Sequence, residues 1–315
     1  MRRFDPPVRL KDVSERNLPD VARALGGYLK FASMAWIRAL REPILDGIII
    51  KHWSRDSGEA TKEFCHRHSC DEVLLRVDTL DKRWSKRRGG YIIPVSKART
   101  VIRELNKEGK IAAFLEPVSP YGDLYSLAAV TDAAQTKMTV EVVGPGFDAS
   151  DLLRSDTLPH ERFEVFLPQL SAPVEKQGDV FAQRTSVMHA DDYRRTVRRR
   201  LVKIGARLKN PAHPEVILNS PGIQGTRLAQ EAIDFLKRTE QTTLLNHLQD
   251  YEPVPRRLLE RFVKGVGSII HGLKRYNIQL GCLAFSGTFT THGRFVFWDF
   301  FPADLTKARM LYLGS

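Results

Sequence analysis

Residues 72–95 read EVLLRVDTLDKRWSKRRGGYIIPV, and they predict two strands joined by a basic loop that ends in two glycines. The largely apolar run 72–77 is typical of a strand, and residues 91–95 resume the pattern after the loop. A helical pattern over 96–109 and a third strand at 111–115 follow. This succession of strand, glycine loop, strand, helix and strand predicts a compact α+β lobe.

The flanking sequence extends the same fold class in both directions. Before the loop, helical periodicity covers 18–41 and 59–68, and an apolar run at 44–50 predicts a strand. After it, we expect a hairpin of strands 125–131 and 137–143, a strand at 163–167, helices within 194–209, 225–238 and 259–273, and terminal strands at 280–286 and 294–300. We therefore predict a two-lobed α+β protein with mixed or antiparallel sheets and flanking helices. Its expected parts are an N-terminal helical segment (1–43), a small lobe with the glycine loop (44–118) and a larger lobe with a basic helix (119–315).

Composition predicts a globular protein that stays in the cytoplasm. The 315 residues are 42% hydrophobic and 27% charged, which supports a core and argues against wholesale disorder. No apolar run approaches the ~20 residues that span a bilayer, and the first residues do not resemble a secretory signal. Three cysteines do not make a disulfide framework. We expect no membrane association.

The net charge of +12 is concentrated in two short segments. Residues 82–88 hold five basic side chains and no acid, and residues 194–209 hold eight basic side chains and no acid, so the rest of the chain has a net charge of −1. Local positive fields of this kind attract phosphates and other polyanions. The alternative is that both segments are solvated surface.

Three carboxylates are candidates for binding. Glu116 ends a strand beside Pro117 and could accept hydrogen bonds from a sugar hydroxyl or an amino group; it could equally be a solvated residue at a strand end. Glu141 and Asp148 flank a turn, Gly144-Pro145-Gly146, and could bind Mg²⁺ or a cationic group. The alternative for Asp148 is that it caps a short helix.

Asp299 lies within a run of large apolar residues, Phe295-Val-Phe-Trp-Asp299-Phe-Phe301. Strand alternation predicts Phe295, Phe297, Asp299 and Phe301 on one face. A buried carboxylate is rare unless it is paired, hydrogen-bonded or bound to a metal. A metal site and a structural hydrogen bond both remain open for Asp299.

Residues 65–70, Cys-His-Arg-His-Ser-Cys, are the one cluster with zinc-ligand chemistry. Zinc sites usually draw paired ligands from two separate segments, and here there is a single segment. We therefore expect Cys65 to be a small buried residue on a helix.

Taken in order, these features resemble the ATP-grasp superfamily of carboxylate–amine and carboxylate–thiol ligases. Residues 73–77, Val-Leu-Leu-Arg-Val, resemble the strand whose cation touches the α/β-phosphates, and Arg88-Gly89-Gly90-Tyr91 resembles the loop that closes over the nucleotide. Leu115-Glu116-Pro117-Val118 resembles the hinge that reads adenosine, and residues 297–299, Phe-Trp-Asp, resemble the metal-bearing terminal strand. The resemblance covers about residues 44–304.

The resemblance implies a set of ligands and the residues that hold them. ATP would contact Arg76, Arg88, Gly89, Gly90, Glu116 and Val118, and Mg²⁺ would bind Asp299 with Glu141, Asp148 or Asp304. Arg76 and Asp299 would be the catalytic residues. The chain departs from the family in three places: Arg76 stands where a lysine is usual, Asp299 begins Asp-Phe-Phe where Glu-x-Asn is usual, and Ser286 stands where the preceding strand commonly has an acid.

The resemblance implies an MgATP-dependent carboxylate–amine or carboxylate–thiol ligase that forms an acyl phosphate on a small or peptidic anionic substrate. The basic helix within 194–209 would recruit that substrate. Two alternatives remain open: an ATP-binding pseudo-ligase without turnover, and a non-catalytic nucleic-acid-binding protein that uses both basic segments on phosphates.

Overall fold

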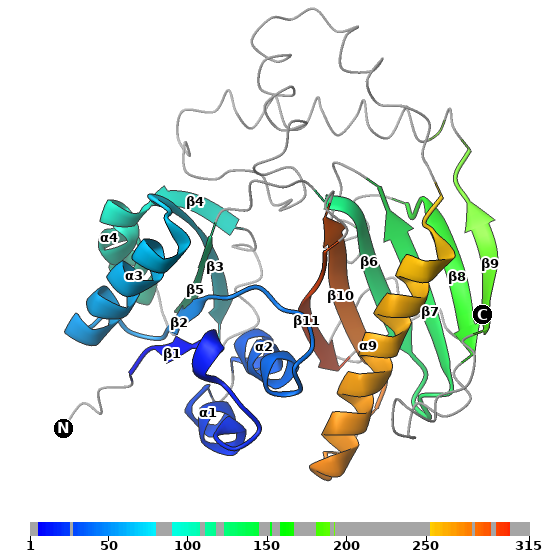
Figure 1. Ribbon diagram of the computed structural model, residues 1–315, viewed down its shortest axis with the longest axis horizontal. Coiled ribbons are helices and arrows are strands. Elements are labelled where there is room, and N and C mark those ends of the chain that lie inside the picture. Colours follow the sequence, from blue (N-terminus) through cyan, green and yellow to red (C-terminus); the bar gives the residue numbers. More distant parts are fainter. Residues whose placement is uncertain are drawn as a thin grey trace, which may run out of the picture. The chain divides into compact units, whose positions relative to one another are not determined.

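The computed structural model describes residues 6–25, 28–79, 90–107, 111–117, 123–144, 152, 158–166, 181–189, 192, 253–278, 281–290 and 294–302. The described residues up to Pro117 belong to one compact unit, and those from Asp123 onward belong to a second (Figure 1). The basic segments 82–88 and 194–209 and the helix predicted within 225–238 lie outside the described residues.

The first unit is a five-stranded antiparallel sheet with helices on both faces. Its strand order is β1-β2-β5-β3-β4. Along the chain, its elements are β1 (Val8–Arg9), the 3₁₀ turn η1 (Leu10–Asp12), α1 (Leu18–Leu25), α2 (Leu29–Ala39), β2 (Ile48–Ile50), α3 (Arg55–His68), β3 (Glu72–Thr79), β4 (Gly90–Pro94), the 3₁₀ turn η3 (Val95–Lys97), α4 (Ala98–Lys107) and β5 (Ile111–Pro117). The strands predicted on both sides of the glycine loop are therefore present and paired.

Alternate residues of the central strands β3 and β5 enter two separate cores. One face packs against α3 and α4, through Val73, Leu75, Ala113, Leu115, Phe64 and Ile102. The other face packs against α1 and α2, through Phe114, Ala112, Ile49, Phe31 and Met34 (Figure 1). Because both faces are covered by helices, these strands read as nearly continuous apolar runs, which is the pattern that predicted them.

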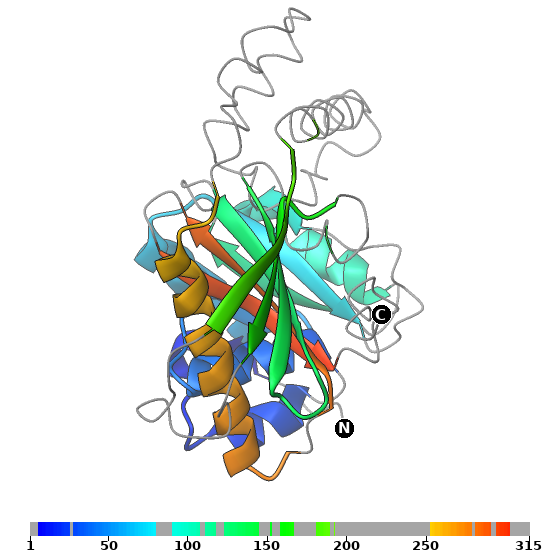
Figure 2. The same cartoon turned by 90° about the vertical axis from the view of Figure 1, so that its right-hand side faces the viewer.

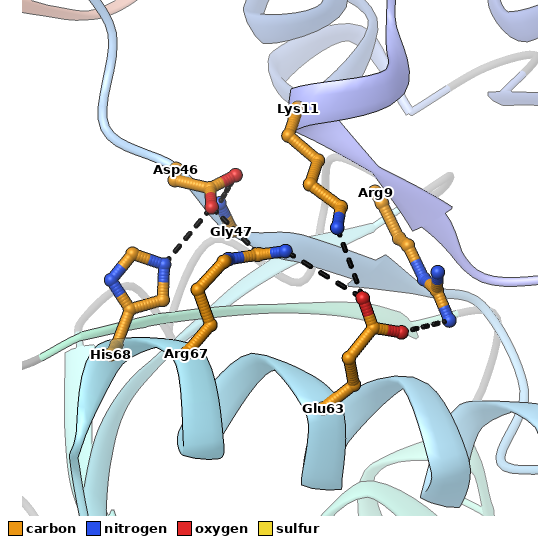
Figure 3. Close-up of polar contacts among 7 residues, drawn as sticks. All are labelled: Arg9, Lys11, Asp46, Gly47, Glu63, Arg67 and His68. Carbon is orange, nitrogen blue, oxygen red and sulfur yellow. Dashed lines mark hydrogen bonds and ion pairs between the residues drawn. The ribbon is translucent and has the colours of Figure 1, made fainter.

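A charged cluster ties the N-terminal segment and the approach to β2 onto α3 (Figure 3). Glu63 of α3 accepts a hydrogen bond from Lys11 at 3.0 Å and pairs with Arg9 at 2.9 Å. The hydrogen bond from Lys11 and the charge of Arg9 lower the pKa of Glu63. One turn further along α3, Arg67 and His68 both contact Asp46, at 2.8 and 3.0 Å. The cluster therefore links β1, η1 and the residues before β2 to a single helix.

Two local features differ from the sequence prediction in this unit. The helical pattern over 18–41 forms two helices, α1 and α2, because Gly26 and Gly27 lie between them and glycine is a poor helix former. The strand predicted over 44–50 is only Ile48–Ile50. Just before it, a Cβ on Gly47 would lie 2.1 Å from the Phe114 ring, so only glycine fits where the chain crosses that ring.

The second unit is a six-stranded antiparallel sheet in the order β11-β10-β6-β7-β8-β9. Its strands are β6 (Asp123–Thr131), β7 (Lys137–Val143), β8 (Glu161–Phe166), β9 (Phe181–Val187), β10 (Leu283–Thr290) and β11 (Phe295–Pro302). The pairing of β6 with β7 confirms the predicted hairpin. Strand β9 was not predicted, since its residues are largely exposed at the sheet edge and carry no apolar alternation.

Helix α9 (Arg256–Arg275) packs across one face of this second sheet (Figure 2). Phe262 of α9 contacts both Phe295 and Phe297 of β11, with ring centroids 5.7 Å apart in each case. The residues just before α9 are fixed by buried Glu161 of β8, which accepts a hydrogen bond from the backbone N–H of Val254 at 2.6 Å. A buried carboxylate thus holds the N-terminal end of α9 on the sheet, where the helix dipole also favours negative charge.

The described elements confirm the predicted fold class, α+β with antiparallel sheets and flanking helices. Among the described residues, no helix has the length and apolar composition needed to span a membrane.

Candidate functional site

Arg76 and Glu116, two of the residues that the sequence singled out separately, form a buried ion pair. The Nε of Arg76 donates to Oε1 of Glu116 at 2.8 Å, and the two side chains are only 7% and 1% exposed. They come from adjacent central strands, β3 and β5, at positions forty residues apart in the chain. The pair was not predicted because its two members had been assigned to different parts of a nucleotide.

Sheet register explains why these two side chains meet. Glu116 lies opposite Leu74 and Arg76 lies opposite Phe114, so Arg76 and Glu116 are diagonal neighbours on one face of the sheet. On the other side of β3, Arg76 lies opposite Gly90, the first residue of β4. The structure therefore brings Arg76, Glu116 and the backbone of Gly90 together across three adjacent strands.

Burial makes Glu116 an unusual carboxylate. It raises the pKa of Glu116, and the opposing charge of Arg76 and the more distant charge of Lys30 limit that rise. Oxygen Oε2 of Glu116 is buried and has no hydrogen-bond partner among the described residues. A buried polar atom without a partner costs about 1–3 kcal/mol, so it calls for a ligand or a structural explanation.

Asp78, two residues beyond Arg76 on the same face of β3, holds helix α2 in place. Its Oδ2 accepts hydrogen bonds from the backbone N–H groups of Lys30 and Phe31, at 2.9 and 3.4 Å. These N–H groups lie in the first turn of α2, where a carboxylate satisfies otherwise unpaired donors. Sequence reasoning missed Asp78, although the polar residues Arg76 and Asp78 alternate with apolar ones along β3 and were a usable signal.

In the second unit, polar residues form one row across the sheet, on the face opposite α9. Successive strand pairings place Asp299 opposite Ser286, Ser286 opposite Ala128, Ala128 opposite Glu141, and Glu141 opposite Arg162. Directly opposed residues of antiparallel strands share a face, so the whole row faces the same way. The α9 face holds Gly287, next to Ser286, where a Cβ would meet the Phe295 ring at 2.8 Å.

Asp299 reaches this row because of a β-bulge. The ladder between β10 and β11 shifts between Ser286 and Gly287, so that Ser286 lies opposite Asp299 whereas Gly287 lies opposite Phe297. The bulge adds one residue and reverses the alternation. The prediction that Asp299 shares a face with Phe295 and Phe297 is therefore wrong. Asp299 is half-buried and accepts a hydrogen bond from the Ser286 hydroxyl at 2.5 Å.

Glu141 lies in the same row but is committed to a different partner. It is buried, and Arg162 donates to its Oε1 through two nitrogens, at 3.1 and 2.5 Å. Three strand spacings separate Glu141 from Asp299, about 14 Å at the usual distance between strands. Oxygens that share one Mg²⁺ lie within 2.1 Å of the ion. Joint ligation of one ion by Glu141 and Asp299 therefore does not fit the sheet register.

The remaining candidates fall partly outside the described residues. Arg88, Gly89, Val118, Asp148 and Asp304 lie there. Within the described ranges, no three His, Cys, Asp or Glu side chains converge as a metal site.

Cys65 is buried at the end of α3, as expected from the sequence, and burial raises the pKa of its thiol to about 12. A thiol that stays protonated is a poor metal ligand and a poor nucleophile.

No protein-family model matches the chain, and no curated protein sequence matches it. Solved structures resemble it more distantly. D-alanyl-alanine synthetase A from Vibrio cholerae is 9% identical with a TM-score of 0.40, over 93% of this chain and 59% of that one. The ADP complex of PurK, an N5-carboxyaminoimidazole ribonucleotide synthetase, is 10% identical with a TM-score of 0.42, over 96% and 53%. The ATP-grasp ligase PsnB in complex with its minimal precursor is 8% identical with a TM-score of 0.32, over 89% and 53%.

Of these three, PsnB is the one whose name states that it is an ATP-grasp ligase. The chain spans little more than half the length of each of these three structures. With every one of these TM-scores below 0.5, the likenesses carry no argument about activity.

His160 holds the backbone of Gly144, the residue directly after β7. Its Nδ1 accepts a hydrogen bond from the backbone N–H of Gly144 at 2.8 Å, so Nδ1 carries no proton. The ring is fully buried, and burial lowers the pKa of His160 to about 3. Sequence reasoning gave this residue no role, because only the fold brings it beside Gly144.

We predict that acid destabilises the second unit through His160. The folded pKa lies below the unfolded value of about 6.5, so the stabilising contribution is complete above pH 6.5 and is lost as pH falls toward 3. The loss approaches about 1.4 kcal/mol per pH unit in that window. Urea unfolding of His160→Asn between pH 7.5 and 4.5 should show a shallower pH dependence than wild type, because the amide oxygen accepts the Gly144 N–H without titrating. The exposed His189→Asn is the control; equal slopes in wild type and His160→Asn contradict this role.

Proposed function

We propose that the chain is an ATP-grasp-like, MgATP-dependent carboxylate–amine or carboxylate–thiol ligase that acts on a small or peptidic anionic substrate. The observation that carries the proposal concerns Oε2 of Glu116. This oxygen is buried and has no hydrogen-bond partner among the described residues, while Arg76 donates to the other oxygen, Oε1. The supporting context is that β3, β4 and β5, which follow one another in the chain, are neighbours in one sheet in the order β5-β3-β4.

Glu116 is suited to recognise a neutral donor such as a ribose hydroxyl or the adenine amino group. Arg76 fixes Oε1 at 2.8 Å, which leaves Oε2 as an acceptor in a dry environment. A hydrogen bond made there is stronger than one made in water, since the local dielectric constant is low. A donor from adenosine would satisfy the atom that is otherwise buried without a partner.

Arg76 is suited to a second task on the same ligand. Its guanidinium has five N–H donors, so the contact with Glu116 uses only part of its capacity. Phosphate oxygens are preferred partners of guanidinium groups. Gly90 lies directly across from Arg76, and Arg88 and Gly89 immediately precede Gly90 in the sequence. In the proposal, Arg76 and Arg88 hold the phosphates, and Val118 packs beside the nucleoside.

For Mg²⁺, Asp299 is the described residue that fits, with the Ser286 hydroxyl 2.5 Å from it. Magnesium in nucleotide enzymes is usually held by one or two carboxylates, by phosphate oxygens and by water, so a single described carboxylate is compatible with it. Asp148 and Asp304 remain candidates for a second carboxylate. Bound Mg²⁺ would neutralise charge on the phosphates. Glu141 would serve instead to orient Arg162.

The reaction in this proposal has two steps. A substrate carboxylate oxygen attacks the γ-phosphorus of ATP while the bond to the β,γ-bridging oxygen breaks, which releases ADP and leaves an acyl phosphate. An amine or thiol then attacks the acyl carbon, loses its proton and displaces inorganic phosphate. In such transfers the protein acts mainly by positioning and by charge stabilisation, which are the roles assigned here to Arg76, Arg88 and Asp299.

Glu116→Gln should weaken ATP binding by about 10- to 100-fold and leave the affinity for inorganic triphosphate nearly unchanged. The reason is that a hydrogen bond to a charged acceptor contributes about 1.5–3 kcal/mol, and triphosphate has no adenosine to make it. Isothermal titration with both ligands measures the difference, and the exposed Glu104→Gln on α4 is a matched control. Parallel losses for ATP and triphosphate would show that Glu116 only maintains the unit.

Asp299→Asn should abolish ATP turnover and the stabilisation of the protein by Mg²⁺ with ATP, while the unliganded protein melts close to wild type. An amide keeps the Ser286 hydrogen bond but loses the anionic oxygen that a divalent ion needs. Thermal unfolding with and without Mg²⁺ and ATP provides a readout besides activity, and Glu164→Gln on β8 controls for a lost carboxylate on the same sheet. If Mg²⁺ stabilises Asp299→Asn as much as wild type, Asp299 is structural.

A further inference from the structure

Helix α9 carries a strong positive charge that the sequence average concealed. Its twenty residues include six arginines and lysines and a single carboxylate, Glu260, which leaves a net charge of +5. Acidic residues elsewhere in the chain offset this excess, so that only the segments 82–88 and 194–209 stood out by charge. Basic side chains of α9 therefore outnumber acidic ones six to one.

The structure separates this charge from the apolar side of the helix. The apolar residues of α9 that face the sheet, including Leu259, Phe262, Val266 and Ile270, are buried. On the opposite side, Arg257, Arg261, Lys264 and Arg275 are exposed. At 100° per residue these four side chains lie within a sector of about 60°, along about 27 Å of helix. We call these four residues the α9 basic stripe.

No carboxylate on the helix lies within the stripe. Glu260 is half-buried and lies beside the stripe but not within it. It accepts a hydrogen bond from Arg256 at 2.8 Å. Glu161 of β8 is fully buried near the N-terminal end of α9 and pairs with Arg184 at 2.8 Å. Figure 2 shows α9 lying along one face of the second sheet, the face opposite the row that contains Ser286 and Asp299.

We propose that the α9 basic stripe binds the phosphate backbone of a double-stranded nucleic acid. A rigid line of cations along a helix matches a partner with regularly repeated anions, and a duplex presents a charge about every 1.7 Å along its axis. Three of the four residues are arginines, whose guanidinium groups make paired hydrogen bonds to phosphate. This inference is independent of the proposed ligase function, because the stripe and the Asp299 row lie on opposite faces of the sheet.

Other polyanions fit the stripe less well. Insertion into an anionic membrane needs an accessible apolar face, and the apolar face of α9 is buried against the sheet. Single-stranded nucleic acid is usually held by aromatic side chains that stack on bases, and the stripe contains none. An acidic peptide would have to present carboxylates in register with the stripe, whereas a duplex offers phosphates in every register.

The test compares two charge reversals of equal size in the full chain. Arg261→Glu with Lys264→Glu changes the stripe, and Arg99→Glu with Arg103→Glu changes two exposed residues of α4. Fluorescence anisotropy with a labelled 20-base-pair duplex, as DNA and as RNA, gives the affinity at several salt concentrations. We expect the stripe variant to bind at least tenfold more weakly at physiological salt and the α4 variant to change less than threefold. The log–log salt slope of the stripe variant should fall by about 1.8, for two lost phosphate contacts.

Each other outcome overturns the proposal. An unchanged stripe variant, or an equal loss in both variants, would mean that α9 has no specific part in binding. If polyglutamate displaces the labelled duplex as well as unlabelled duplex does, an acidic peptide is the better partner. If vesicles with anionic lipid displace it equally well, the better partner is a membrane surface. If charge reversal harms folding, the milder double variant Arg261→Gln with Lys264→Gln serves in its place. Comparison of the two probes shows whether the bound duplex is DNA or RNA.

Discussion

The buried contact between Arg76 and Glu116 is the constraint around which the first unit is arranged. Two charges removed from water are costly, and their attraction repays that cost only when the geometry is good and the remaining polar atoms are satisfied. Here one oxygen of Glu116 has its partner at 2.8 Å while the other has none among the described residues. Because an apolar pair in such a position is often no less stable, the proposed nucleotide site gives a reason for the pair.

The rest of the unit supports that contact. Helices cover both faces of β3 and β5, which keeps water away from the pair, and Asp78 holds the first turn of α2 against the same face. The second unit has a comparable arrangement, since α9 covers one face of its sheet and leaves the polar row of Ser286 and Asp299 on the other. In both sheets, therefore, helices pack on apolar residues while polar side chains gather where strand register aligns them.

Local patterns in the sequence predicted the central strands of both sheets but not the edge strands β1 and β9, because apolar runs mark buried strands and these two strands have no such run. They did not reveal which strands are neighbours, and for that reason Arg76 and Glu116 were identified as separate candidates and not as partners. The bulge beside Ser286 reversed the expected face of Asp299, since a single inserted residue breaks the alternation without leaving a clear mark in the sequence. The charge of α9 escaped notice because net charge was averaged over residues that only the fold separates.

One double variant tests the central claim, that Arg76 and Glu116 are buried together for nucleotide binding and not for stability. Arg76→Met with Glu116→Leu replaces the pair by apolar side chains of similar size, a change that is often neutral or stabilising by about 1–4 kcal/mol. Urea unfolding and ATP titration of this variant should give an unfolding free energy at least equal to that of wild type, with no detectable ATP binding. A loss of several kcal/mol in stability, or ATP affinity equal to wild type, would contradict the account.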